Sequence, residues 1–173
     1  GIAYSELGQY DEAIIRLMVE TGIRLSEVIA LTADDLDLVA GLVTIQRGKG
    51  GRGRIIPVGS ATIAAIHDYL AVRRIQPHAD RDELWLGERN CGLVADALYR
   101  SLRRRAEPAG IVGFRPHRLR HTAAHRWLAA GGSESGLMAM AGWTRVGMLI
   151  RYTRANAGER AAAEARRLDL GNL

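Results

Sequence analysis

One lysine stands out among the basic residues of this 173-residue chain. The chain has 24 lysines and arginines, and every one except Lys49 is an arginine. Lys49 lies in a glycine-rich run, residues 48–53. Because an ammonium group gives up a proton far more readily than a guanidinium, Lys49 is a candidate proton donor.

Five further side chains can bind anions, transfer protons or attack as nucleophiles. They are Arg24, His117, Arg120, Trp143 and Tyr152. Each has an ordinary structural explanation when it is taken alone: Arg24, for example, can pair with Glu27 one helical turn on. A specific chemistry is indicated only by the combination of these residues.

The charge of the chain is unevenly distributed. The net charge is +5 and the isoelectric point is near 10.0. Residues 1–99 have a net charge of −4, whereas residues 100–173 have a net charge of +9. A basic half beside an acidic half suggests a surface that binds a polyanion, with nucleic acid as the first candidate.

The elements that must position these residues are mostly helices. Helical spacing of apolar residues predicts eight of them, over residues 9–21, 26–32, 60–74, 92–107, 116–130, 134–141, 145–152 and 158–168. Two β-like runs, 42–47 and 54–58, flank the glycine-rich run and predict a hairpin. The short apolar run 84–86 is the expected third strand. The expected fold class is therefore α+β, mostly α-helical, with a small three-stranded antiparallel sheet.

Composition excludes several classes of protein. Cys91 is the only cysteine, which excludes a disulfide framework within the chain and a multi-cysteine metal site. The sequence has no apolar run long enough to span a bilayer and no signal peptide, so we expect a cytoplasmic protein without a membrane partner. The chain begins at Gly1 rather than at a methionine, which suggests a fragment of a longer protein.

Five short segments occur in an order that resembles one known family. They are Thr21-Gly22-Ile23-Arg24-Leu25-Ser26-Glu27, Gly48-Lys49-Gly50, His117-Arg118-Leu119-Arg120-His121, Ala141-Gly142-Trp143 and Arg151-Tyr152. Together they resemble the catalytic domain of the tyrosine recombinases, the phage integrase family, from about Ala13 to Tyr152. We expect residues 1–173 to form this domain, without the N-terminal helical domain that clamps DNA in the family.

The resemblance implies a transesterification on double-stranded DNA that needs no metal, ATP or other cofactor. Tyr152 would attack a phosphodiester, form a 3′-phosphotyrosyl link and release a 5′-hydroxyl. Arg24 and Arg120 would bind the phosphate oxygens, because a guanidinium donates two parallel hydrogen bonds to them. Complete recombination in the family requires four protomers on two duplexes. Composition and the Ala-Gly-Trp segment favour an integrase of a bacterial mobile element.

The resemblance also assigns the proton transfers. His117 would be the base or proton shuttle for the phenol, and Lys49 would protonate the departing 5′-oxygen. Trp143 stands where family members more often have histidine, and its indole N–H can donate a hydrogen bond but cannot transfer a proton. Glu27 is expected to hold Arg24 in place, and His121 to make a supporting hydrogen bond.

A zinc hydrolase is one alternative interpretation. His117, His121 and His125 are spaced to lie on one helix face, as in the His-Glu-x-x-His proteases. However, Arg118 occupies the position of the catalytic glutamate, and Arg120 lies between the first two histidines. Two guanidiniums disfavour a dication, and no carboxylate base is available.

A protein that binds DNA without cutting it is the second alternative. Short helices on a basic domain also fit a helix-turn-helix regulator or a catalytically inactive relative. Such a protein has no need of Tyr152 or of a single lysine in a turn, which favours the enzyme.

Overall fold

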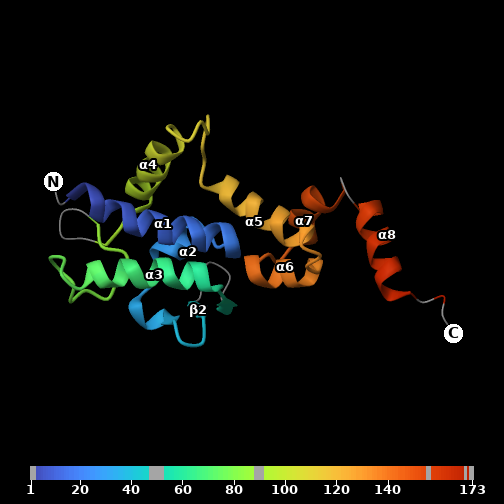
Figure 1. Ribbon diagram of the computed structural model, residues 1–173, viewed down its shortest axis with the longest axis horizontal. Coiled ribbons are helices and arrows are strands. Elements are labelled where there is room, and N and C mark those ends of the chain that lie inside the picture. Colours follow the sequence, from blue (N-terminus) through green and yellow to red (C-terminus); the bar gives the residue numbers. More distant parts are fainter. Residues whose placement is uncertain (1–2, 47–52, 88–91, 155–156, 170, 172–173) are drawn as a thin grey trace.

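A computed structural model describes residues 3–46, 53–87, 92–154, 157–169 and 171 (Figure 1). The candidate proton donor Lys49 and most of its glycine-rich run lie outside the described residues, as does Cys91.

Helix α1 (Ala3–Thr21) runs through the larger part of the molecule (Figure 1). Ile14, Leu17 and Met18 recur at helical spacing on one face of α1, and each is at most 1% exposed. This face packs against α3 (Ser60–Arg73) and α5 (His117–Ala129). The resulting core also includes residues of α2 (Leu25–Ile29) and α4 (Ala95–Ala106).

The sheet has three antiparallel strands in the order β1–β2–β3. A short 3₁₀ helix, η1 (Ala33–Asp35), leads into β1 (Leu36–Asp37), and β2 (Leu42–Ile45) and β3 (Arg54–Pro57) follow. Val43 pairs with Ile56, and Ile45 pairs with Arg54. Val43, Ile45 and Ile56 are buried, whereas Ile55 faces solvent, as the alternation of side chains along a strand requires. The predicted small antiparallel sheet is confirmed.

The prediction of the third strand was wrong. The segment around residues 84–86 forms only isolated bridges, Glu83 with Thr32 and Leu86 with Gly92, and β1 is the third strand instead. Leu84 and Trp85 are fully buried, so the apolar run belongs to the core. Its backbone is bonded partly by other backbone segments, since the Leu84 N–H donates to the Leu31 carbonyl at 2.9 Å and the Trp85 carbonyl accepts the Leu93 N–H at 3.0 Å. The Leu84 carbonyl instead accepts from side chains of α3, the Tyr69 hydroxyl and Arg73 Nε, both at 2.9 Å. Tyr69 and Arg73 thus supply some of the hydrogen bonds that a neighbouring strand would provide.

A second, smaller core lies towards the C-terminal end. Helices α5, α6 (Glu134–Ala141) and α7 (Val146–Thr153) enclose it with residues that include Leu128, Leu137, Trp143 and Tyr152. The last helix, α8 (Ala157–Leu168), has no buried residue and stands apart at the end of the molecule (Figure 1). Its Arg160 donates to Glu134 at the start of α6, at 2.8 Å.

The eight α-helices of the described residues agree with the predicted ones to within a few residues, apart from α1, which begins earlier. In the part of the chain that the structure describes, no helix combines the length and apolar character that crossing a bilayer would take.

Candidate active site

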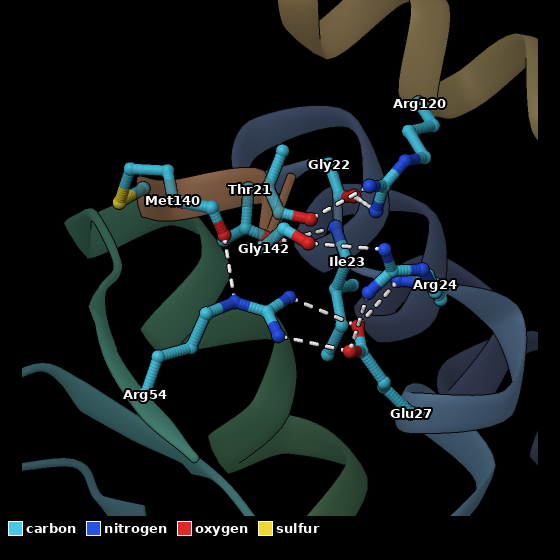
Figure 2. A network of polar contacts seen from close by, with 10 residues as sticks. Thr21, Gly22, Ile23, Arg24, Glu27, Arg54, Arg120, Met140 and Gly142 are labelled. Atoms are coloured by element: carbon cyan, nitrogen blue, oxygen red, sulfur yellow. Dashed lines mark hydrogen bonds and ion pairs between the residues drawn. The ribbon is translucent and has the colours of Figure 1, made fainter. Parts of the chain in front are cut away.

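The C-terminal end of α6 gathers three guanidinium groups from three other elements (Figure 2). The consecutive carbonyls of Met140, Ala141 and Gly142 accept N–H groups from Arg54, Arg120 and Arg24, at 2.9, 2.6 and 3.0 Å respectively. The last carbonyls of an α-helix lack partners within the helix and carry partial negative charge. This helix end is therefore suited to hold cationic side chains close together.

Gly142 terminates α6 in a conformation that glycine adopts readily. Its φ is 63° and its ψ is 39°, which is left-handed backbone. The next residue, Trp143, donates its backbone N–H to the carbonyl of Met138 at 2.8 Å. A Cβ atom at position 142 would lie 2.7 Å from Nη1 of Arg54. The turn thus requires glycine both for its backbone and for the close approach of Arg54.

Glu27 lies between Arg24 and Arg54. Its Oε2 accepts the backbone N–H of Arg24 at 2.9 Å, and its Oε1 accepts Nη1 of Arg24 at 3.1 Å. Nη1 and Nη2 of Arg54 donate to the two carboxylate oxygens at 2.8 and 2.9 Å. Arg24 immediately precedes α2 and Glu27 lies in its first turn, so this carboxylate also caps the helix.

Glu27 is ionised at neutral pH despite its burial. Burial alone raises the pKa of this carboxyl group. Hydrogen bonds from Arg54 and from the backbone of Arg24, together with the charges of both guanidiniums, outweigh burial and lower the pKa to about 2. The cluster therefore contains a permanent negative charge between its arginines.

Arg120 is buried although it is charged, with 5% of its surface exposed. It reaches from α5 to the end of α1, where its Nη1 donates to the Gly22 carbonyl at 2.5 Å. Its guanidinium also lies over the ring of Trp143, 5.3 Å from the centroid. Burial and the charges of Arg24 and Arg54 lower its pKa to about 10, so Arg120 remains a cation at neutral pH.

Tyr152 packs into the same region from α7. Its ring stacks on Trp143 with centroids 5.3 Å apart and planes inclined by 16°. Its hydroxyl lies 2.5 Å from Nδ1 of His121, within hydrogen-bonding distance. The ring of His117 is 4.4 Å from that of His121, centroid to centroid. The histidine within hydrogen-bonding distance of the phenol oxygen is thus His121, and the His125 ring packs edge-on against the Tyr152 ring at 5.3 Å. The sequence favours His117 as the partner of the phenol.

The indole nitrogen of Trp143 is buried and has no hydrogen-bond partner among the residues that the structure describes. A buried N–H without a partner is uncommon and calls for an explanation. Trp143 lies between the Arg120 guanidinium and the Tyr152 ring. The ring of Trp143 is thus held in place by packing, while its N–H donor is left without a protein partner among the described residues.

A pocket of about 760 Å³ opens beside these groups. Its polar lining includes Arg24, Arg115, His117 and Arg120, and Met18 and Ile23 are among its apolar lining residues. A concave, positively charged pocket with apolar walls is a typical binding site for an anionic ligand.

The structure thus brings Arg24, Glu27, His117, Arg120, His121, Trp143 and Tyr152 into one region. Lys49 lies outside the described residues. Sequence reasoning missed Arg54, whose only signal was its place at the start of the strand after the glycine-rich run. The described residues include no group of three or more histidine, cysteine, aspartate or glutamate side chains arranged to hold a metal ion.

Comparison with known proteins gives a consistent result. The phage integrase family model matches residues 2–159. Tyrosine recombinase XerC of Shewanella amazonensis is 35% identical over 144 residues, covering 83% of this chain and 48% of the relative. XerC of a Roseiflexus species is 33% identical over 150 residues, covering 84% of this chain and 48% of the relative. The chain thus spans about half the length of these curated relatives.

Solved structures show the same fold. The crystal structure of XerA recombinase matches with a TM-score of 0.77 and 26% identity, over 95% of this chain and 63% of that one. The XerH site-specific recombinase bound to its difH substrate matches with a TM-score of 0.74 and 24% identity, over 90% of this chain and 46% of that one.

Proposed function

Because the chain belongs to the phage integrase family, we propose that it is the catalytic domain of a tyrosine recombinase, which cleaves and rejoins DNA through a covalent 3′-phosphotyrosyl intermediate. The convergence of Arg24 and Arg120 on adjacent carbonyls at the end of α6 carries this proposal. Both cations line the same pocket, and Arg120 lies over Trp143, on which the Tyr152 ring stacks.

The arginines are suited to bind a DNA phosphate. The hydrogen bonds to protein described above use two N–H groups of the Arg24 guanidinium and two of the Arg120 guanidinium, and a guanidinium has five. Arg24, Arg54 and Arg120 carry three positive charges against the single negative charge of Glu27. The excess positive charge favours a phosphodiester and favours still more the transition state, in which negative charge grows on the non-bridging oxygens.

Tyr152 supplies the nucleophile. As the phenolic oxygen bonds to phosphorus, its proton passes to Nδ1 of His121, which lies 2.5 Å away and accepts it in the tautomer with Nδ1 unprotonated. His117 is placed to relay that proton towards the pocket. The bond from phosphorus to the 5′-oxygen breaks, and Lys49 protonates the departing oxygen. Attack by a 5′-hydroxyl reverses these steps and rejoins the strand, so no cofactor is consumed.

Trp143 contributes a hydrogen bond rather than a proton. Its unpartnered indole N–H lies beside Arg120 and donates to a phosphate oxygen when DNA is bound. Fixed donors aimed at developing charge often accelerate a reaction more than any other single feature of an active site.

Double-stranded DNA is the proposed partner. The described surface carries exposed arginines on α4, in the pocket lining and on α5: Arg100, Arg103, Arg104, Arg115 and Arg118. Such side chains bind the DNA backbone without regard to sequence. The comparison structure of XerH holds its difH substrate, and recombination by this family leads us to propose assembly of four protomers on two duplexes.

A nicked suicide substrate tests the proposal. On such DNA the cleaved fragment carrying the 5′-hydroxyl diffuses away, so the covalent adduct accumulates on a denaturing gel. We expect wild-type protein to form the adduct at low salt and Tyr152→Phe to form none, while Tyr152→Phe still binds the same DNA.

Tyr69→Phe is the matched control. It also removes one phenolic oxygen, but from the core, where the Tyr69 hydroxyl bonds the backbone of Leu84 and Leu86. We expect it to cost stability, about 1–3 kcal/mol, and to retain the adduct. Binding of DNA by the wild type with no adduct would instead favour the inactive DNA-binding relative.

A further inference from the structure

We propose that Arg54 is a positioning residue of this active site, holding the phosphate-binding pair Arg24 and Arg120 in place through Glu27 and through the C-terminal turn of α6. This inference rests on the proposed function, because it assigns the two arginines to phosphate binding.

The first contact is with Glu27. The two terminal nitrogens of Arg54 bind the two carboxylate oxygens side by side, at 2.8 and 2.9 Å (Figure 2). The same carboxylate receives both the backbone N–H and the Nη1 of Arg24. Arg54 therefore sets the orientation of the carboxylate, and the carboxylate sets the orientation of Arg24.

The second contact is with α6. Nε of Arg54 donates to the Met140 carbonyl at 2.9 Å. The next two carbonyls along the chain hold Arg120 and Arg24. Gly142 leaves room for this arrangement, since a Cβ there would clash with the Arg54 guanidinium. Arg54 of β3 thus binds the same helix end to which both phosphate-binding arginines donate hydrogen bonds.

Burial separates the role of Arg54 from that of Arg24. The Arg54 side chain is 14% exposed and that of Glu27 is 8% exposed, whereas that of Arg24 is 45% exposed. Arg24 also lines the pocket, and Arg54 is not among the lining residues. Arg54 is therefore placed to act on substrate through its neighbours rather than by contact.

Only arginine meets all three acceptors at once. A planar guanidinium presents Nε and both terminal nitrogens in fixed directions, whereas a lysine ammonium is a single point of charge. Lysine at this position keeps the charge but cannot bind both carboxylate oxygens and the Met140 carbonyl with one rigid group. Arg54→Lys thus keeps the positive charge at position 54 and removes the hydrogen-bond geometry of the guanidinium.

Titration of the Glu27 carboxyl group by carbon-13 NMR is the first test, and it does not depend on activity. Glu27 is faced by Arg24 and Arg54 and feels the charge of Arg120. Arg54→Met removes two hydrogen bonds and one charge while burial remains, so we expect the pKa of Glu27 to rise into the mildly acidic range.

The matched control is Arg105→Met. Arg105 also pairs with a buried carboxylate, that of Asp11, but far from α6. It should leave the Glu27 titration unchanged. An unchanged pKa of Glu27 in Arg54→Met would overturn the inference whatever the enzyme does. Loss of the fold in both Arg54→Met and Arg54→Lys would also overturn it, because Arg54 would then serve stability alone.

The second test is the single-turnover rate of adduct formation against pH. We expect Arg54→Met and Arg54→Lys to slow the reaction on the order of a hundredfold, as small misplacements of reacting groups do, with DNA affinity nearly unchanged. Arg54→Met should also lose rate on acidification as Glu27 becomes protonated, and Glu27→Gln in that background should remove this dependence on pH.

The two proposals fail differently. If the wild-type protein forms no adduct, the proposed function is contradicted. The titration of Glu27 then still tests whether Arg54 holds the Glu27 carboxylate in place. An active wild type whose rate and pH profile are unchanged by Arg54→Met contradicts the positioning role alone.

Discussion

At the level of a single residue, Trp143 serves the site in two ways. Its indole nitrogen is buried and has no hydrogen-bond partner among the described residues. Its ring packs against both the Arg120 guanidinium and the Tyr152 ring. Position 143 therefore combines a packing role with a hydrogen-bond donor. The two roles can be separated by substitution.

Trp143→Phe keeps an aromatic ring and removes the donor. We expect adduct formation to slow on the order of a hundredfold or more, the usual cost of losing one donor to developing charge. Single-turnover rates on the nicked substrate measure this. Trp143→His restores a donor in a smaller ring and should recover part of the rate. Equal rates for wild type and Trp143→Phe would show that the indole N–H does not act on phosphate.

Lys49→Arg keeps the positive charge and removes a ready proton donor. We expect it to slow strand cleavage, because arginine gives up a proton poorly at neutral pH. A substrate with sulfur in place of the bridging 5′-oxygen has a leaving group that needs no proton, and it should restore the rate of this variant. A variant that remains slow on the sulfur substrate would count against Lys49 as the acid.

The site residues differ in how far the sequence could indicate them. The sequence predicts five of them from the order of the short segments in which they occur, and each residue type suits one step of phosphate chemistry. These residues are Arg24, His117, Arg120, Trp143 and Tyr152. Arg54 was not, because its partners lie 27 and 86 residues away in the chain. Local pattern carries no information about such pairings. The contact of His121 with Tyr152, which is 31 residues away, could not be predicted from the sequence for the same reason.

The C-terminal turn of α6, with its cap Gly142, is the element on which the proposed chemistry depends most. Its three carbonyls hold the three arginines, and its shape depends on the left-handed backbone of Gly142. A change in this turn should therefore affect the chemistry as well as stability.

Gly142→Ala and Gly131→Ala form a matched pair. Both glycines follow a helix and have positive φ, 63° and 81°. A Cβ at Gly131 meets nothing within 4 Å, whereas at Gly142 it meets Arg54 at 2.7 Å. Each substitution should cost about 1 kcal/mol or more for the backbone. Only Gly142→Ala should also slow adduct formation, and equal rates for the two variants would contradict the role of the turn.

Helices were predictable here and the third strand was not. Apolar residues at helical spacing, with glycines at the helix ends, located α3, α5 and α6 to within one or two residues. The run 84–86 has the composition of a strand, yet Tyr69 and Arg73 of α3 bond its backbone. A two-residue strand such as β1 is too short to leave a pattern in the sequence.

The uneven charge of the whole chain leads to a prediction about DNA binding. Affinity should fall steeply with salt, because phosphate contacts release counterions. Arg104→Gln, at an exposed position of α4, should reduce the slope of log affinity against log salt by about one. Arg74→Gln at the end of α3, across α1 from α4 (Figure 1), should leave the slope unchanged. Equal slopes for all three proteins would contradict this choice of DNA-binding face.

The most direct test of the proposed chemistry is to identify the amino acid that becomes attached to DNA. Adduct formed on the nicked substrate can be digested and its nucleotide-bearing peptide sequenced by mass spectrometry. We expect a nucleotide joined through its 3′-phosphate to the oxygen of Tyr152. Attachment to any other residue, or through a 5′-phosphate, would contradict the assignment of Tyr152 as the nucleophile.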